Sequence, residues 1–535
     1  MRDKAKAPKS WMLAPATHRR MTDELVSLLS AIEPKGKVDA FRINYLRSEL
    51  LSKFNDPEAG ADDRREKAIT KWLLMEQRNA KTNLRLRTSY GCVWPLKGQK
   101  WLSSILIEET ARRTIRRVLG DLPLDLLGGN FTSGASTQFK REPGVLAAKF
   151  KVAADVTEDC YYMASRAIDD AVTWSSYRGP LVPRVVKGSV LFTVPKNSEI
   201  DRVAAKEPDL NMYCQKAVGN HIRKRLKRCY GIDLNDQTRN QELARKGSVD
   251  GSLATIDLSS ASDLISDAIV KLLFPREWYD LLDAIRSRSV SVDGTWTELH
   301  MFSSMGNAFT FEVETLIFYA LSNAVAYLTG TRGTISVYGD DIIVPSRVGG
   351  LVTKVFQWYG FKVNPKKSYW SGSFRESCGK HWYNGVDVTP FYVREPVVHV
   401  TRAIHLLNRL RAWAEMPGTG VCDPRFYDYW KRWSKVVPRQ FHGGWDCERI
   451  DMLVTPDKPC QKLVTVKRDV RIDEVGAYLQ WLRNAEGRTS VAEALITSKV
   501  RAEVAGKYAA RRVQTGANLG YCQGRKNIPV WADEA

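Results

Sequence analysis

The sequence predicts an α+β fold in which helical segments flank a central region of short strands. Residues 1–90 are charged and helix-prone. Between residues 249 and 400 the pattern changes to short apolar strands that alternate with turns and helices. After residue 400 the chain is helix-prone again and rich in Trp and Arg, and it ends in a basic stretch near residues 501–525.

The composition indicates a globular protein with an anionic partner. The chain has 535 residues, enough for three or four lobes at about 150 residues each. Hydrophobic residues make up 44% of the sequence, which allows a large buried core. Lys and Arg total 81 against 60 Asp and Glu, a formal charge of 81 − 60 = +21. Nucleic acid is the commonest partner that offsets such an excess, although a merely basic protein remains an alternative.

Cysteine usage and hydropathy predict a protein of a reducing compartment without a membrane span. The nine cysteines form no CxxC pair and lack zinc-finger spacing, so we expect free thiols. The longest apolar stretch, Val313 to Leu328, contains Glu314 and is too short and too polar to span about 30 Å of hydrocarbon. We expect it to form a buried helix. The first residues lack the apolar core of a signal peptide, so a soluble, cytoplasmic protein is expected.

The sharpest local pattern is ISVYGDDIIV at residues 335–344. Apolar residues flank Gly339, Asp340 and Asp341 on both sides, which predicts a β-hairpin with two acidic residues at its tight turn. Neighbouring carboxylates repel each other, and a bound divalent cation would offset that cost. For an isolated pattern of this kind, an ordinary Asp-containing turn is the better explanation.

A further acidic residue strengthens the metal hypothesis. In LATIDLSSASD, residues 253–263, a short apolar strand ends at Asp257 and small polar residues lead to Asp263. Asp257 lies 340 − 257 = 83 residues before Asp340, which leaves room for a helix and a strand that bring the two carboxylates together. Two metal ions about 3.5–4 Å apart could then activate a 3′-hydroxyl and stabilise a departing pyrophosphate. The alternative is a helix N-cap, which applies more to Asp263 than to Asp257.

Basic residues are dense upstream of these carboxylates. A strand predicted at residues 190–196 leads into a basic segment that runs to Arg228. A triphosphate that approaches carboxylates needs cations, because metal ions alone do not neutralise it. The cluster HIRKRLKR at 221–228 would wrap around most faces of a helix, so a solvated surface or a phosphate-backbone contact fits it as well as a catalytic role.

The order of these patterns resembles the A, B and C motifs of template-dependent RNA polymerases: a strand ending in Asp, a glycine loop before a helix, and a GDD hairpin. More closely, the chain resembles the replicase beta subunit of the positive-strand RNA bacteriophages, the leviviruses. The phrases that carry this resemblance lie in unbroken order within about 190–395, and they are FTVPKNSEIDR, IDLNDQ, GSVDGSLATIDLSSASD, SSMGNAFTFEVETLIF, VYGDDII and FRESCGKHWYNGVDVTPFY.

The resemblance implies a right-hand polymerase fold of fingers, palm and thumb, with an antiparallel palm sheet that bears the catalytic aspartates. It implies two Mg²⁺ ions, for which Mn²⁺ can substitute. Their implied ligands are Asp257, Asp340, Asp341 and the backbone carbonyl of Leu258. Asp340 is the member expected to be indispensable. The implied reaction is the RNA-directed synthesis of RNA from ribonucleoside triphosphates on a single-stranded phage genome.

The resemblance also implies a nucleotide site. Its residues are Lys196, Arg202 and Lys206 in the triphosphate channel, Asp263 near the ribose, and Gly306, Asn307 and Thr310 along the template and nucleotide pocket. Many polymerases have Asn four residues after that Thr, whereas this chain has Glu314. Ribose selection by this position is therefore an open question.

Two further segments resemble the D and E motifs. In GFKVNPKKSYW, Lys367 is the expected proton donor to pyrophosphate, ahead of Lys366, and two surface lysines in a turn are an equal alternative. Residues 374–387 are expected to form a hairpin that grips the primer end. Cys378 and His381 in this segment are too few ligands for a metal site.

The expected domain division follows the polymerase plan. Residues 1–90 are a helical part of the fingers and partner-binding surface, 91–248 the fingers with the nucleotide entry, 249–400 the palm with a fingers insertion near 275–300, and 401–535 the thumb with a basic C-terminal region. The expected partners are RNA template and product, ribonucleoside triphosphates and, by resemblance alone, host elongation factors Tu and Ts and a host ribosomal protein. No membrane contact is expected, and the expected site of action is the cytoplasm of the bacterial host.

Two other functions remain open from the sequence. A reverse transcriptase also fits the pattern of residues 338–341, but the small residues 259–262 before Asp263 favour ribonucleotides, because reverse transcriptases generally have a bulky side chain in motif A. A non-enzymatic RNA-binding protein would explain the charge of +21 but not the ordered carboxylates.

Overall fold

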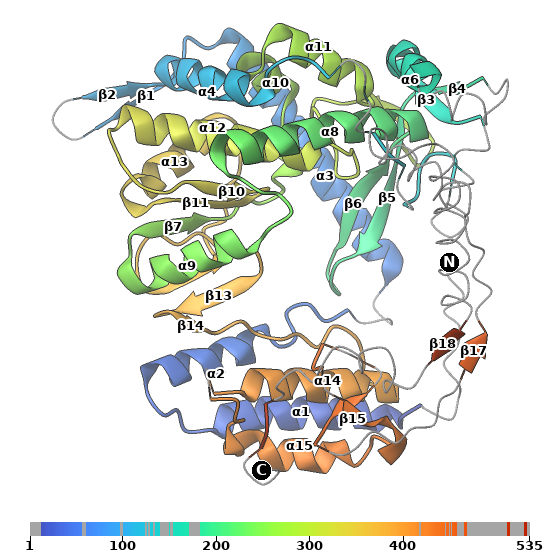
Figure 1. Ribbon diagram of the computed structural model, residues 1–535, viewed down its shortest axis with the longest axis vertical. Helices are drawn as coiled ribbons and strands as arrows, with labels where there is room; N and C mark the ends of the chain where they lie inside the picture. The colour runs from blue at the N-terminus through green and yellow to red at the C-terminus, as the bar shows by residue number, and fades with distance from the viewer. Residues whose placement is uncertain are drawn as a thin grey trace, which may run out of the picture.

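The chain forms two lobes, each with its own apolar core (Figure 1). The computed structural model describes residues 12–55, 60–96, 100–123, 126, 129–131, 134–139, 149, 153–170, 182–416, 419–444, 446–448, 450, 452–456, 465–467, 511–513 and 529–531. The predicted basic stretch at 501–525 therefore lies outside the described residues, except for 511–513.

A three-stranded antiparallel sheet lies at the centre of the larger lobe. Its order is β10-β11-β7, with β7 at Leu253–Ile256, β10 at Ser336–Tyr338 and β11 at Asp341–Pro345. Tyr338 pairs with Asp341 across the tight turn, and Ile342 pairs with Ile256 of β7. The predicted GDD hairpin and the predicted strand before Asp257 are both confirmed, and the register brings the end of β7 beside the hairpin turn.

Helices cover both faces of this sheet because its side chains alternate between two apolar cores. Ala254 and Ile256 belong to the large core, which they share with α12 (Thr310–Leu328) and α13 (Ser346–Trp358). Leu253 packs instead against α9 (Thr238–Asp250). The helix α12 is buried along most of its length, as predicted for Val313 to Leu328. No helix among the described residues is long and apolar enough to cross a membrane.

A second sheet and one long helix form the wall opposite the hairpin turn. The sheet order is β6-β5-β8-β9, and its strands are β5 (Ser189–Pro195), β6 (Asp201–Lys206), β8 (Ser289–Val292) and β9 (Thr295–Glu298). The strand predicted at 190–196 is thus confirmed. The β5–β6 hairpin packs against α3, the 28-residue helix Ala61–Thr88.

Further helices and short strands complete the larger lobe (Figure 1). The helices are α4 (Ser104–Leu119), α6 (Glu158–Asp170), α8 (Asp209–Tyr230), α10 (Asp267–Leu273) and α11 (Arg276–Ile285). The short strands are β1 (Val93–Pro95), β2 (Trp101–Ser103), β3 (Asp155–Thr157) and β4 (Arg184–Val186). The helix α8 carries the basic cluster at 221–228, which is therefore helical as considered from the sequence.

The smaller lobe combines the two ends of the described chain. Its helices are α1 (Pro15–Ala31), α2 (Lys37–Glu49), α14 (Val400–Ala414) and α15 (Tyr427–Ser434), and Trp531 is buried in the same core. The described residues between 12 and 90 are mostly helical, as predicted, but packing divides them. The helices α1 and α2 belong to this core, whereas α3 packs in the larger lobe. The functional boundaries at residues 90, 248 and 400 remain predictions.

A small antiparallel sheet lies where the two lobes meet. It consists of β12 (Phe374–Ser377), β13 (Lys380–Tyr383) and β14 (Val386–Asp387), so the hairpin predicted within 374–387 is present. Phe41 of α2 stacks on Tyr383 with ring centroids 4.2 Å apart. Among the described residues, Cys92, Cys160, Cys214, Cys229, Cys378 and Cys447 are free thiols.

Candidate active site

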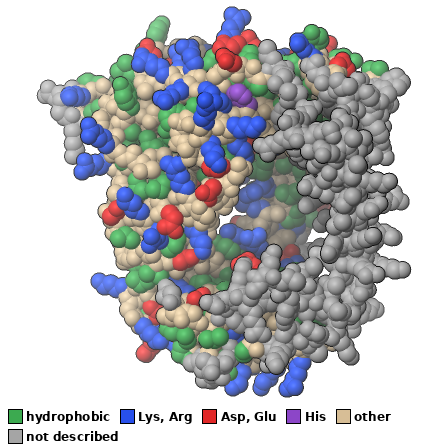
Figure 2. Space-filling view, in the orientation of Figure 1, with side chains coloured by type: hydrophobic (Ala, Val, Ile, Leu, Met, Phe, Trp, Pro, Cys, Tyr) green, Lys and Arg blue, Asp and Glu red, His purple; other side chains and the backbone are tan. Residues whose placement is uncertain are grey.

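A cavity of about 610 Å³ lies at the open end of the central sheet, facing the β5–β6 hairpin and α3. Figure 2 shows a hollow between the two lobes with Lys and Arg side chains on its walls. The residues predicted from the sequence that line the cavity are Lys196, Arg202, Asp257, Leu258, Asp263, Asp340 and Lys367, together with Glu314. The structure thus brings together residues from five separate stretches of the chain.

Asp257 is held at the cavity by the strand-like segment that follows α13. The Nδ2 of Asn364 donates to Asp257 Oδ2 at 2.8 Å, and the Asn364 backbone N–H donates to the Asp257 carbonyl at 2.9 Å. The Asp257 backbone N–H donates to Ser368 Oγ at 3.1 Å. These contacts fix one carboxylate oxygen of Asp257 and leave the other available to a ligand. Asn364 and Ser368 were not predicted, because only the folded chain places them beside β7.

The turn that carries Asp340 depends on glycine. Gly339 has a φ of +61°, and a Cβ added there would lie 2.4 Å from Phe311 Cε2 and 3.0 Å from Glu314 Oε1. The Gly339 N–H donates to Thr315 Oγ1 at 3.0 Å. The hairpin turn is therefore pressed directly onto α12, which sets the position of Asp340 relative to the cavity.

Asp341 points away from this cavity lining. Its Oδ1 accepts from the Cys378 N–H at 2.9 Å and from Ser377 Oγ at 3.2 Å, in the turn between β12 and β13. Its backbone carbonyl accepts from Asn240 of α9 at 3.1 Å. Asp341 therefore ties the central hairpin to the small sheet, whereas Asp340 lines the cavity.

The carboxyl groups of the cavity have raised pKa values. Burial raises the pKa of Asp257 to about 6, with Asp340 and Asp341 adding to the rise while Lys367 and Asn364 oppose it. Burial likewise raises the pKa of Asp340, although its side chain is open towards the cavity. Burial and then Asp340 raise the pKa of Glu314, which is 6% exposed, well above its usual range. This concentration of acids is costly without a cation.

Asp263 is positioned by α3. It lies in a short 3₁₀ turn, Ser262–Leu264. The N-cap positions of this turn and of α10 are Ala261 and Ser266, so Asp263 is not a helix N-cap. Asn79 Nδ2 of α3 donates to the Asp263 backbone carbonyl at 2.7 Å. Burial raises the pKa of Asp263 to about 6, against the opposing charge of Lys71 on the same helix. Lys71 lines the cavity but was not distinguishable from other lysines of a charged helix.

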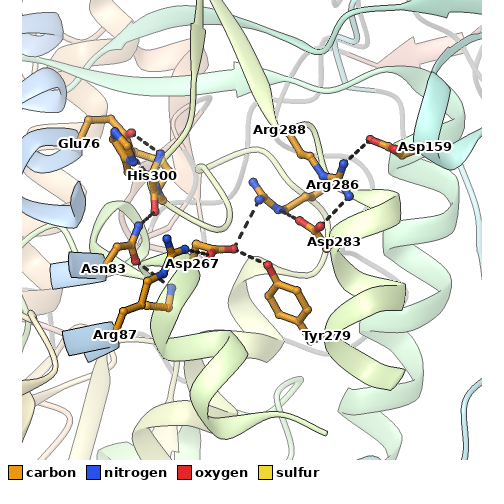
Figure 3. Close-up of polar contacts among 12 residues, drawn as sticks. Glu76, Asn83, Arg87, Asp159, Asp267, Tyr279, Asp283, Arg286, Arg288 and His300 are labelled. Atoms are coloured by element: carbon orange, nitrogen blue, oxygen red, sulfur yellow. Dashed lines mark hydrogen bonds and ion pairs between the residues drawn. The ribbon is translucent and has the colours of Figure 1, made fainter. Parts of the chain in front are cut away.

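A polar network joins α3 to the segments that carry His300 and Asp267 (Figure 3). Glu76 accepts from the backbone N–H of His300 at 2.7 Å, and Asn83 donates to the His300 carbonyl at 2.9 Å. The same carbonyl accepts from the backbone N–H of Asp267, at the start of α10. Tyr279 donates to the Asp267 carboxylate at 2.7 Å. The helix α3 thus fixes the backbone at His300 and, through it, the start of α10.

The cations at the cavity come from the β5–β6 hairpin, from α3 and from the segment after α13. Lys196 and Arg202 lie near the hairpin tip, where burial and the charges of Lys71 and Arg202 lower the pKa of Lys196. Lys206 lies at the other end of β6, with its ammonium 5.3 Å from the Phe192 ring centroid and outside the cavity lining. Crowded cations beside carboxylates are the arrangement expected where a polyanion binds.

Most of the basic cluster on α8 makes structural contacts. Arg223 donates to Glu312 Oε1 from both Nε and Nη2, at 3.0 and 2.7 Å, and Glu312 is 2% exposed. Arg225 donates to the backbone carbonyls of α4, and Lys227 pairs with Asp233. Lys224 is exposed at the surface. Most side chains of this cluster are therefore engaged in contacts within the protein, and the structure does not favour a phosphate-binding role for the cluster as a whole.

Three predicted pocket residues lie in and just after the turn that leads into α12. Gly306 has a φ of +118°, and a Cβ there would lie 2.1 Å from the Ala205 carbonyl oxygen of β6. Asn307 Oδ1 accepts from the Phe309 N–H at 3.0 Å, and Thr310 Oγ1 donates to the Ser304 carbonyl at 3.1 Å. The backbone of Gly306 thus lies against the strand β6 rather than against the cavity. None of the three residues lines the cavity.

Lys367 lines the cavity, whereas Lys366 does not. The Lys367 ammonium lies 3.4 Å from Glu376 Oε1 of β12. In the part of the chain that the structure describes, no group of three or more His, Cys, Asp or Glu side chains is close enough to hold a metal ion by itself.

A family model and two curated relatives place the chain in one family. The chain matches the family model described as RNA replicase, beta-chain, over residues 22–528. It is 39% identical over 473 residues to the RNA-directed RNA polymerase beta chain of Enterobacteria phage GA, covering 85% of this chain and 87% of that protein. It is 44% identical over 425 residues to the protein of the same description from Escherichia phage MS2, covering 78% and 76%. Among solved structures, the RNA-dependent RNA polymerase of a human picobirnavirus aligns over 79% of this chain and 83% of that chain, with a TM-score of 0.43 and 13% identity.

Proposed function

This chain belongs to the RNA replicase beta-chain family and is an RNA-directed RNA polymerase, and we propose that it copies a single-stranded RNA phage genome by two-metal-ion nucleotidyl transfer in the cavity described above. One observation carries the mechanistic proposal. Asp257 and Asp340, from adjacent strands of the central sheet, line one cavity that Lys71, Lys196, Arg202 and Lys367 also line.

The donor atoms of the cavity suit a hard divalent cation. Asp257 and Asp340 offer carboxylate oxygens, the Leu258 carbonyl is the further expected ligand, and Asp341 supports the hairpin from behind. Two carboxylates are sufficient, because Mg²⁺ is commonly bound by one or two carboxylates with substrate phosphates and water completing the shell. When bound, Mg²⁺ or Mn²⁺ would favour ionisation of the attacking 3′-hydroxyl and offset the charge of the departing pyrophosphate.

The rest of the cavity suits a ribonucleoside triphosphate. Lys196 and Arg202 would bind the phosphates, with Lys71 of α3 as a third cation and Lys206 as a more distant one. Asp263 would accept from the ribose hydroxyls. The small residues 259–262 line the cavity beside it and leave space for a 2′-hydroxyl. Gly306, Asn307 and Thr310 would act on the pocket through the turn that they stabilise.

Proton transfer completes the proposed reaction. The 3′-oxygen of the growing strand forms a bond to the α-phosphorus and loses its proton to water, while the bond from that phosphorus to the bridging oxygen breaks. Lys367 would donate a proton from Nζ to the leaving pyrophosphate and regain one from water. General acid catalysis of this kind typically contributes about 10²–10⁴-fold to a rate.

The right-hand arrangement is part of the proposal. The central sheet with Asp257 and Asp340 would be the palm, the β5–β6 hairpin with α3 would belong to the fingers, and the smaller lobe would be the thumb. Host elongation factors Tu and Ts, a host ribosomal protein and action in the bacterial cytoplasm remain expectations from the family, and no contact of the described residues bears on them.

The test is incorporation of labelled ribonucleotides on an RNA template, with and without Mg²⁺. We expect Asp340→Asn to abolish incorporation and to leave RNA binding intact. Asp293→Asn, in the exposed β8–β9 turn, is the matched control and should retain both. Equal loss of binding and incorporation in a folded Asp340→Asn protein would favour a non-enzymatic RNA-binding protein. Preferential use of deoxyribonucleotides would favour a reverse transcriptase.

A further inference from the structure

We propose that Glu376 is a positioning residue that holds the Lys367 ammonium at the cavity, and that Tyr45 and His381 hold Glu376 in turn. The inference rests on the proton-donor role proposed above for Lys367. It adds a connection from α2 in the smaller lobe, through the small sheet, to the proposed acid.

The first link is the ion pair between Lys367 and Glu376. Lys367 Nζ lies 3.4 Å from Glu376 Oε1, and the Lys367 side chain is 49% exposed while that of Glu376 is 16% exposed. A lysine stem has four rotatable carbons and does not hold one position at a surface without a partner. Glu376 is fixed on β12, where it pairs in register with His381 of β13. The more buried Glu376 carboxylate therefore determines where the Lys367 ammonium lies.

The second link is the histidine behind that carboxylate. His381 Nε2 lies 3.4 Å from Glu376 Oε1, and its Nδ1 lies 2.7 Å from the Tyr45 hydroxyl. The His381 side chain is 6% exposed, and burial lowers the pKa of the imidazole. A neutral ring donates from one nitrogen and accepts at the other. The geometry fits an imidazole that accepts from Tyr45 and presents its Nε2 proton to Glu376.

The third link is the contact between the lobes. Tyr45 and Phe41 lie on α2, and both pack against the small sheet. Phe41 stacks on Tyr383 at an interplanar angle of 3°, and Tyr45 meets Phe374 edge-on with ring centroids 5.3 Å apart. Stacked aromatic rings fix relative orientation as well as distance. A shift of the smaller lobe would therefore move Tyr45, and with it the carboxylate that holds Lys367.

Other charges around Lys367 do not take over this role. Asp257 and Asp341 also attract the Lys367 ammonium, whereas the nearby Lys53 repels it. Asp257 already accepts from Asn364, and Asp341 from Cys378. Without Glu376, the remaining attraction would draw Lys367 towards the carboxylates rather than towards the leaving phosphate.

The experiment is a double-mutant cycle on nucleotide incorporation by the full chain. The variants are Lys367→Met, Glu376→Gln and the two combined, with Glu242→Gln on α9 as the matched control because its ion pair with Arg245 is exposed. The maximal incorporation rate and the nucleotide concentration at half-maximal rate are measured separately. Thermal unfolding and RNA binding verify that each variant is folded.

We expect Lys367→Met to lower the maximal rate about 100-fold and Glu376→Gln to lower it about tenfold, with little change in half-saturation. The combined variant should be no slower than Lys367→Met alone, because the two residues act through one proton. Glu376→Asp should recover part of the rate. Tyr45→Phe should lower the maximal rate about threefold, again with little change in half-saturation.

Two results separate failure of this inference from failure of the proposed acid. An unchanged maximal rate in Lys367→Met would overturn the proton-donor role and the inference with it. A slow Lys367→Met combined with a normal Glu376→Gln, or with multiplicative losses in the combined variant, would leave the acid in place and overturn the positioning role of Glu376.

Discussion

Substituting Gly339 with alanine tests whether the turn before Asp340 must lie against α12. The φ of +61° at this position disfavours any residue with a Cβ, and the added carbon would lie 2.4 Å from Phe311 Cε2. Gly330, with a φ of +65° and nothing within 4 Å of its added Cβ, is a matched control. The pair of variants separates backbone strain from the steric clash.

The expected losses in unfolding free energy follow from the backbone strain and the steric clash. Left-handed backbone costs an L-residue about 1–2 kcal/mol, and this applies to both variants. Only Gly339→Ala adds the clash, and ordinary contact at 3.4 Å requires a shift of 3.4 − 2.4 = 1.0 Å between the turn and Phe311. Overpacking of this kind costs about 1–3 kcal/mol more. A displacement of about 1 Å at a reacting centre can lower a rate about 100-fold.

The assay compares urea unfolding and ribonucleotide incorporation for Gly339→Ala and Gly330→Ala. We expect both variants to be destabilised, Gly339→Ala more so, and only Gly339→Ala to lose about 100-fold in incorporation rate with RNA binding retained. Equal destabilisation of the two variants, with normal incorporation by Gly339→Ala, would refute the argument that contact with α12 positions Asp340.

Two further predictions concern buried charges. The pKa of Asp257 is raised to about 6 from a model-peptide value of 3.8, so the metal-free protein should lose about 2–3 kcal/mol of stability from this group as pH rises from 4 to 6. In metal-free urea titrations, the unfolding free energy of Asp257→Asn should not fall over this pH range. If the Asp257→Asn variant and the unmodified protein show the same dependence on pH, the prediction is wrong. Arg223→Ala should cost about 3 kcal/mol in unfolding free energy, because it leaves the buried Glu312 carboxylate unpaired. Lys224→Ala should instead leave stability unchanged and weaken RNA binding only at low salt, and the reverse pattern would show that Arg223 is not structural.

The sequence alone identified the strand before Asp257, the hairpin around Asp340 and the buried helix after residue 309. Each of these depends on local patterns, namely a run of apolar residues, a glycine turn and the length of an apolar stretch. The order of the motifs also identified the family. Local patterns are sufficient here because each element forms from residues that are adjacent in the chain.

Only the tertiary structure decided which side chains meet. It brings Asn364 to Asp257, Lys71 to the cavity and Glu376 to Lys367, although no periodicity marks any of them. It also placed Gly306 against the β6 strand and divided the helices α1, α2 and α3 between the two lobes. The physical reason is that these contacts join residues far apart in sequence, so they depend on how the helices and sheets pack rather than on the preference of any one segment.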